Sequence, residues 1–110
     1  MTKKVPANIR KLMRELKQGL SDIYGVKLKG VYLYGSYARG DYRAGSDVDV
    51  MVLLKTYKNY WKEYERASDY FSEVSLKYDL TVSCLLMKEI QWKNSNMPVL
   101  SNIRKEGVLA

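Results

Sequence analysis

The segment Tyr34–Val52, YGSYARGDYRAGSDVDVMV, contains the residues that decide the fold and chemistry of this chain. Gly35 and Ser36 directly follow an apolar run, and ten residues later come Asp47 and Asp49, one residue apart. Apolar residues then resume, so the two aspartates lie within what reads as a buried strand. Carboxylates are rarely buried without a partner, so this pair requires an explanation.

The spacing of the two aspartates predicts a metal site. Residues i and i+2 of a strand point the same way, so Asp47 and Asp49 project from one sheet face and repel each other unless a cation lies between them. A divalent ion with oxygen ligands is the natural counter-charge. Asp79 opens a third apolar strand pattern. If that strand lies beside the second, the three carboxylates suit the two-metal chemistry of phosphoryl transfer.

The Gly35-Ser36 pair predicts a phosphate-binding turn. Glycine lets the chain turn sharply and approach a ligand, and Ser36 can cap a following helical turn whose free N–H groups favour a phosphate. Arg39 and Arg43 lie in the adjoining loop and can neutralise phosphate oxygens. Beside a metal site, these are the parts needed to hold a metal–nucleoside triphosphate.

Each of these features alone has a plain structural explanation. An Asp-x-Asp pair is more often a turn or strand-edge feature, a Gly-Ser pair is usually an ordinary turn, and surface arginines are usually solvated. Their conjunction favours a functional site, because the structural explanation must account for each feature independently.

Composition limits the chemistry further. With 110 residues, the sequence is interpreted as one domain, 1–110. It contains no histidine, which excludes Ser-His-Asp triads and histidine-ligated metals. Cys84 is the only cysteine, which excludes an internal disulfide, and is interpreted as a small buried hydrophobe. A metal must therefore be bound by oxygen, which favours magnesium or manganese.

The net charge of +7 suits a polyanionic partner. Because the basic residues are spread along the chain, a solvated basic surface explains them as well as a nucleic-acid patch does. No apolar run approaches the roughly 18 residues of a membrane span. The N-terminus is polar and has no apolar signal core, so the sequence predicts a cytoplasmic protein without a membrane partner.

Apolar periodicity predicts a small mixed α/β sheet, with helices packed mainly on one face and an undetermined strand order. The second long helix is recognised by a stripe that includes Trp61, Tyr64, Ser68 and Phe71. The expected elements are a helix over about 7–24, a strand over 31–34, a helical turn over 36–39, a strand over 48–54, this second long helix ending near 78, a strand over 80–86 and a helix over 98–106.

The glycine-serine and aspartate motifs resemble those of a known family. Gly35-Ser36, ten residues, then Asp47-Val48-Asp49 matches the G-S-x10-D-x-D signature of the nucleotidyltransferase superfamily related to DNA polymerase beta. The longer stretch GSYARGDYRAGSDVDV is most similar to the minimal nucleotidyltransferases, the MNT group. The resemblance covers most of the chain, although the last ~25 residues are less diagnostic.

The resemblance implies a polymerase beta-like palm fold and transfer of a nucleoside monophosphate, AMP from ATP, with release of pyrophosphate. It implies that Asp47, Asp49 and Asp79 bind two magnesium ions, with manganese as a substitute, and that Asp79 helps to deprotonate the acceptor hydroxyl. It also implies that Gly35 and Ser36 hold the triphosphate, with Arg39 as a helper.

MNT proteins are often antitoxins that adenylylate a tyrosine of a HEPN-domain toxin, so the resemblance implies a HEPN-domain protein as partner. We therefore expect a protein adenylyltransferase. Transfer to a small molecule or to an RNA end ranks second, and an antitoxin that acts by stoichiometric binding ranks third. Nucleic acid is a less favoured partner, and the sequence leaves the acceptor, the base preference and any homo-oligomer open.

Overall fold

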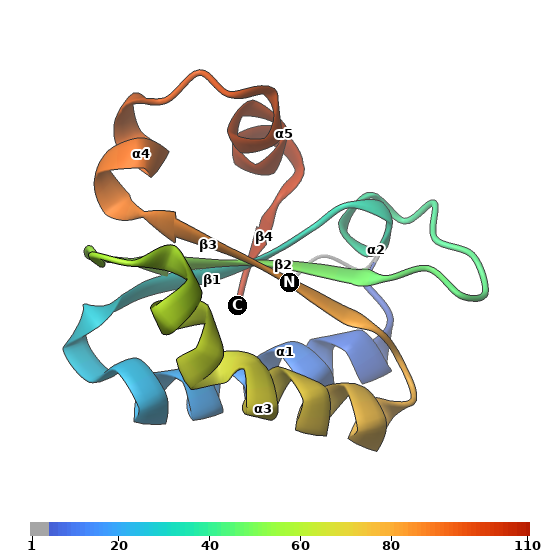
Figure 1. Cartoon of the computed structure of the whole chain (residues 1–110). Helices are drawn as coiled ribbons and strands as arrows, with labels where there is room; N and C mark the ends of the chain where they lie inside the picture. The colour runs from blue at the N-terminus through green and yellow to red at the C-terminus, as the bar shows by residue number, and fades with distance from the viewer. Residues whose placement is uncertain (1–4) are drawn as a thin grey trace.

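The computed structural model describes residues 5–110, and within them a four-stranded sheet lies between two layers of helices (Figure 1). The elements, in chain order, are α1 (Ala7–Tyr24), the 3-10 helix η1 (Gly25–Lys27), β1 (Leu28–Tyr34), α2 (Ser36–Arg39), β2 (Val48–Leu54), α3 (Tyr60–Tyr78), β3 (Val82–Lys88), α4 (Glu89–Asn94), α5 (Pro98–Glu106) and β4 (Val108–Leu109).

The strand order, which the sequence left open, is β3-β2-β1-β4. The central strand β2 is parallel to β3 and antiparallel to β1, and β4 is antiparallel to β1. Asp49 of β2 is paired with Tyr34 on one side and with Ser83 on the other. Every residue of β2 except Asp49 is buried. A carboxylate is thus set in the middle strand of the sheet, as the sequence predicted.

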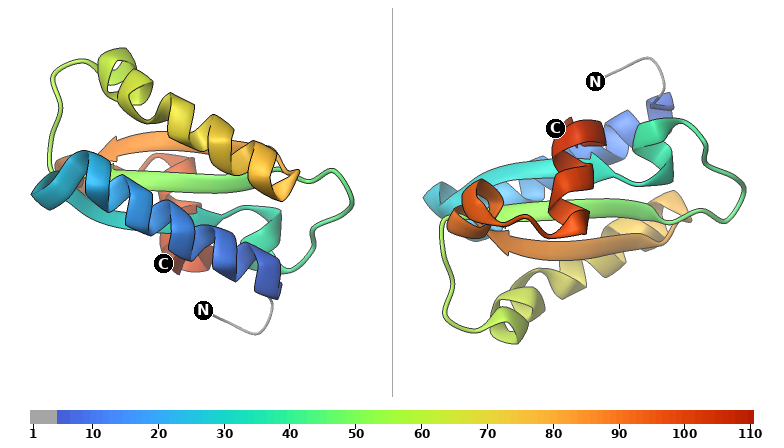
Figure 2. Two further views of the ribbon diagram at one scale, coloured as in Figure 1. Left: turned by 90° about the horizontal axis from the view of Figure 1, so that it is seen from below. Right: turned by 90° about the horizontal axis from the view of Figure 1, so that it is seen from above.

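The two long helices, α1 and α3, cover one face of the sheet (Figure 2). Because β2 alternates its side chains, Val48, Val50 and Val52 contact this layer. The apolar stripe of α1 is buried, and its members are Ile9, Leu12, Met13, Leu16, Leu20 and Tyr24. The stripe predicted for α3 is confirmed at Phe71, which is buried together with Ala67 and Val74, but it is wrong at Trp61, which is 69% exposed.

The shorter helices α4 and α5 cover part of the opposite face. A second apolar cluster fills this layer, and its buried members are Met51, Leu53, Met87, Leu100 and Ile103. The helix α5 has the predicted bounds, whereas the two-residue strand β4 was not predicted, because two residues are too few to show a periodicity. No helix in residues 5–110 combines the length and the apolar character needed to cross a membrane.

The position predicted for Asp79 is wrong. The third strand begins only at Val82, and Asp79 is the residue that ends α3. It has a left-handed backbone (φ 53°), and its N–H donates to the carbonyl of Leu76 while the N–H of Leu80 donates to the carbonyl of Ser75. These are the bonds of a helix C-cap. Aspartate accepts a left-handed backbone more readily than most residues, so the local structure explains Asp79 without a metal.

Candidate functional site

A cavity of about 500 Å³ lies where β1 ends and β2 begins. The two strands are antiparallel, so the end of one and the start of the other meet at the same edge of the sheet. The cavity brings together the predicted residues Gly35, Ser36, Arg39 and Asp49. The remaining lining residues are Tyr34 from β1 and Val99, Asn102 and Glu106 from α5.

Gly35 is required at this corner for two separate reasons. Its backbone has φ 75°, which side chains other than glycine rarely tolerate. A Cβ atom at this position would also overlap Oδ2 of Asp49. Gly35 precedes α2 as its cap residue, so Ser36 is the first residue of the helical turn and does not cap it as predicted. The close approach of Gly35 keeps the turn directly against the Asp49 carboxylate.

Asp49 is half-buried between β1 and β3. Burial raises the pKa of its carboxyl group, the negative charge of Asp47 raises it further, and the positive charge of Arg39 opposes both. Asp47 precedes β2 by one residue and is exposed. The charged form of Asp49 is therefore higher in free energy than that of a solvated carboxylate, and a bound cation would offset this difference. The pair fits a magnesium ion, which is commonly bound by one or two carboxylates together with substrate phosphates.

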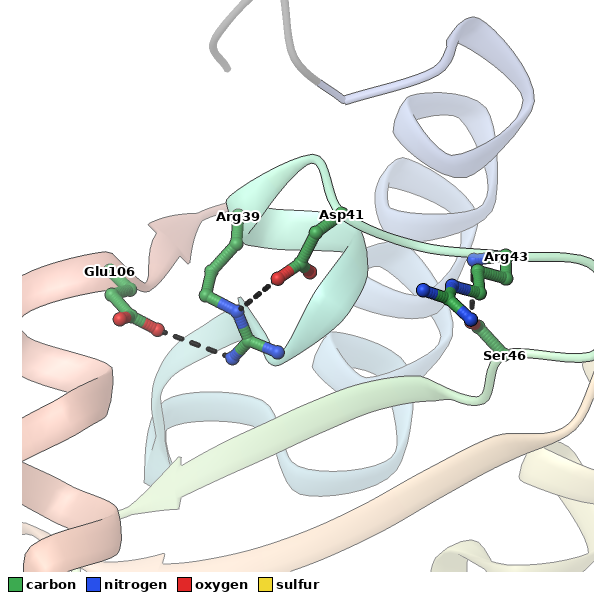
Figure 3. Close-up of polar contacts among 5 residues, drawn as sticks. All are labelled: Arg39, Asp41, Arg43, Ser46 and Glu106. Atoms are coloured by element: carbon green, nitrogen blue, oxygen red, sulfur yellow. Dashed lines mark hydrogen bonds and ion pairs between the residues drawn. The ribbon is translucent and has the colours of Figure 1, made fainter.

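Arg39 is held at the rim of the cavity by two carboxylates (Figure 3). Its Nε lies 3.2 Å from Oδ2 of Asp41, and its Nη1 lies 3.4 Å from Oε2 of Glu106. The Arg39 side chain is 44% exposed, and exposed ion pairs are weak because water screens them. A phosphate group entering the cavity can therefore replace these carboxylates as the partner of Arg39.

Arg43 has a different place from the one predicted for it. Its backbone N–H donates to Oγ of Ser46 (2.8 Å), and the N–H of Ser46 donates to the Arg43 carbonyl (3.0 Å). These bonds close the loop that leads into β2 (Figure 3). Arg43 does not line the 500 Å³ cavity, whereas Arg39, the last residue of α2, does.

Asp79 is not brought together with the other two aspartates. It lines a separate hollow of about 390 Å³ with Gly45, Ser46, Ser75 and Thr81, among others. Within residues 5–110, no three His, Cys, Asp or Glu side chains form a group that could hold a metal ion. The three predicted carboxylates do not form one cluster: Asp49 lines the 500 Å³ cavity, Asp79 lines the separate hollow, and Asp47 lines neither.

The C-terminal helix α5 contributes residues that were not predicted from the sequence. Val99, Asn102 and Glu106 of α5 are spaced three and four residues apart, which marks one face of a helix. That spacing was visible in the sequence, but nothing in it showed that this face closes the Asp49 cavity. Tyr34 was seen only as a strand residue. Burial raises the pKa of the Tyr34 phenol to about 12, and the negative charge of Asp49 is the second cause of this rise. Tyr34 therefore remains a hydrogen-bond donor.

Comparison with known proteins identifies the family of the chain. A family model described as "Nucleotidyltransferase domain" matches residues 13–107. A Methanocaldococcus jannaschii protein named "Putative protein adenylyltransferase" is 42% identical over 81 residues, which are 74% of this chain and 81% of that protein. Another protein of the same name and organism is 28% identical over 101 residues, covering 91% of this chain and 95% of that one.

Solved structures share the fold. A nucleotidyltransferase from Sulfolobus solfataricus, described as putative, is 25% identical with a TM-score of 0.65 and covers 93% of this chain and 80% of its own. A chain from the complex of a tri-AMPylated Shewanella oneidensis HEPN toxin with its MNT antitoxin is 18% identical, with a TM-score of 0.60 and coverage of 91% and 69%. The resemblance seen in the Gly-Ser and Asp-x-Asp motifs is confirmed: the chain belongs to the nucleotidyltransferase domain family.

Proposed function

We propose that this nucleotidyltransferase transfers AMP from ATP to a hydroxyl group of a partner protein, a tyrosine of a HEPN-domain toxin, and so acts as an antitoxin. The observation that carries the proposal is the single cavity in which a glycine turn, an arginine and a half-buried aspartate meet. The names of the relatives support protein adenylylation, and the toxin–antitoxin structures of the same fold support the kind of partner.

The reaction forms one bond and breaks one. The acceptor oxygen attacks the α-phosphorus of ATP, and the bond from that phosphorus to pyrophosphate breaks. The close backbone approach at Gly35 and Ser36 leaves room for the triphosphate, and Arg39 exchanges its carboxylate partners for phosphate oxygens. Because the chain has no histidine, a carboxylate is the side chain available to accept the acceptor's proton. Of the two carboxylates that line the cavity, Glu106 is paired with Arg39, so Asp49 is the carboxylate proposed for this role.

Asp47 and Asp49 are the residues that would hold a magnesium or manganese ion, with substrate phosphate oxygens completing the ligand set. When bound, the ion neutralises negative charge on the phosphates. Asp79 has no part in this proposal, because it lines a different hollow and its left-handed backbone serves the end of α3.

The test is transfer of label from ATP labelled on the α-phosphate, with magnesium and a purified HEPN-domain protein. The wild-type chain should label the partner, and Asp49→Asn should reduce the rate by about 100-fold or more. Asp79→Asn is the matched control, since asparagine also accepts the left-handed conformation, and it should label the partner at the wild-type rate.

Three other outcomes would redirect the proposal. Equal labelling by wild type and Asp49→Asn would remove Asp49 from the catalytic site. Label on RNA or on an aminoglycoside, with none on protein, would support the second-ranked acceptors. Suppression of the toxin by Asp49→Asn at the same dose as wild type, without any label, would support an antitoxin that acts by stoichiometric binding.

A further inference from the structure

The end of the sheet far from the Asp49 cavity carries a basic surface that the proposed reaction does not use. The turn between β2 and α3 lies at this end together with η1 and α4, whereas α2 and its loop lie at the other (Figures 1 and 2). Lys55 follows Asp49 by six residues along an extended strand, which places the two about 20 Å apart at ~3.3 Å per residue.

Two hollows flank this turn. One has a volume of about 400 Å³ and is lined by Lys27, Lys58 and Lys62, with Tyr57 among its other members. The second, of about 310 Å³, is lined by Lys55 and Lys93 and by the exposed side chain of Ile90. Thr56 lines both hollows, so they adjoin across the turn. We call the five lysines together with Tyr57 and Trp61 the distal basic surface.

The positive charge of the distal basic surface is largely uncompensated. None of its five lysines belongs to an ion pair within residues 5–110. Of the two carboxylates that line the hollows, Glu63 is paired with Arg66 at 3.3 Å and Glu89 lies in the first turn of α4. Five lysines that the sequence shows only as scattered residues therefore gather around one turn.

An exposed aromatic ring, Trp61, belongs to the same segment of the chain as Lys55, Lys58 and Lys62. Trp61 is 69% exposed although it was expected in the buried stripe of its helix. Edge-on contacts with Tyr60 (5.1 Å between ring centroids) and Tyr64 (6.0 Å) support the indole from one side. Tyr57 extends the aromatic group toward the turn, 5.9 Å from Tyr60. A supported but exposed indole offers a surface on which a nucleic-acid base can stack.

We propose that the distal basic surface binds single-stranded nucleic acid, with phosphates along the lysines and a base stacked on Trp61. Interleaved aromatic and basic side chains, in the segment KTYKNYWK from Lys55 to Lys62, are the combination that single strands require. A duplex encloses its base faces and offers nothing for the indole to stack on. An acidic peptide matches the lysines but leaves the face of Trp61 without a partner.

The test is fluorescence anisotropy with labelled oligouridine and oligothymidine of about 12 nucleotides in about 50 mM KCl, where binding in the micromolar range is expected. The variant Lys55→Ala/Lys58→Ala/Lys62→Ala should weaken binding at least about tenfold. It should also reduce the slope of log K against log salt by about 2, since each phosphate contact on a single strand contributes about 0.7. Trp61→Ala should weaken binding about fivefold or more with little change in that slope.

The matched control is Lys11→Ala/Arg14→Ala/Lys105→Ala, which removes the same charge from exposed positions elsewhere. It should bind the oligonucleotides within about twofold of wild type, and circular dichroism should show all variants folded. Equal weakening by this control would overturn the proposal, because attraction would then depend on net charge alone. Binding of an oligoglutamate peptide without binding of either oligonucleotide would overturn it in favour of an acidic protein segment.

Asp49→Asn separates this inference from the proposed reaction. The distal basic surface predicts that Asp49→Asn binds the oligonucleotides as tightly as wild type, whether or not the chain adenylylates a protein. Loss of binding in Asp49→Asn would place the oligonucleotide in the catalytic cavity and overturn the inference.

Discussion

Asp49 and Asp79 stand at comparable points in the sequence, each beside an apolar strand pattern, yet the structure gives them different surroundings. Asp49 lies within β2, half-buried between two strands and beneath α5. Asp79 is exposed and ends α3 in a left-handed conformation three residues before β3 starts. The difference shows that a carboxylate becomes part of a site through the elements that enclose it, and that its neighbours in sequence do not decide this.

Replacement of Asp49 should give the largest effect. We expect Asp49→Asn to reduce adenylyl transfer by about 100-fold or more while the melting temperature is unchanged or higher, because the substitution removes a half-buried charge and its repulsion by Asp47. Label transfer and thermal unfolding, measured on the same preparation, check both parts. A large fall in melting temperature would show that the Asp49 carboxylate supports the fold, and would contradict the contrast drawn between Asp49 and Asp79.

Gly35 and Gly45 allow the same comparison at the two hollows. Both have positive φ, 75° and 84°, but an added Cβ at Gly35 meets Asp49 whereas at Gly45 it meets nothing within 4 Å. Gly35→Ala should abolish adenylyl transfer and destabilise the fold. Gly45→Ala should carry only the backbone cost of about 1–2 kcal/mol and keep most of its activity. Equal losses of activity in the two variants would contradict the claim that Gly35 is needed for its contact with Asp49.

Substitutions at Asp79 should change stability and leave activity within about twofold of wild type. Asp79→Gly should stabilise the fold by a few tenths of a kcal/mol to about 1 kcal/mol, because glycine adopts the left-handed conformation without strain. Asp79→Ala should destabilise it by a similar amount. Urea unfolding measures both. Loss of transfer in Asp79→Gly with intact stability would return Asp79 to the catalytic site.

The smallest effect is expected at Glu106. Glu106→Gln removes one of the two carboxylates that hold Arg39, so Arg39 is freer to bind phosphate and ATP should bind about two- to threefold tighter. Asp41→Asn, which removes the other partner at 3.2 Å, should act in the same direction. Calorimetric titration with ATP measures the change. Weaker binding of ATP by Glu106→Gln would show that this carboxylate positions the substrate, and would add α5 to the catalytic machinery.

Local patterns predicted most of the elements. The helices α1 and α5 and the strand β2 have the bounds that capping residues and apolar periodicity indicated. The prediction failed where two patterns overlap: Leu80 continues an apolar alternation into the residues that end α3, so the strand seemed to begin too early. The prediction that Trp61 is buried was wrong for a related reason. Neighbouring positions on a helix point about 100° apart, so an error of one position takes a side chain off the buried face.

The candidate site was predicted in part. Gly35, Ser36, Arg39 and Asp49 line one cavity as expected, because a turn and a neighbouring strand are joined by a short loop. Val99, Asn102 and Glu106 could not be assigned to it, since they are some 50 residues away in the sequence and reach the cavity only when α5 packs on the sheet.

By itself, the sequence determined that Asp49 lies on a strand and that a glycine turn precedes it, because side-chain alternation and glycine's conformational freedom are local properties. The tertiary structure alone decided which carboxylates meet, which helix closes the cavity, and where the lysines gather. These depend on how β2, β3 and α5 pack, and packing is decided by the fit of whole surfaces to one another.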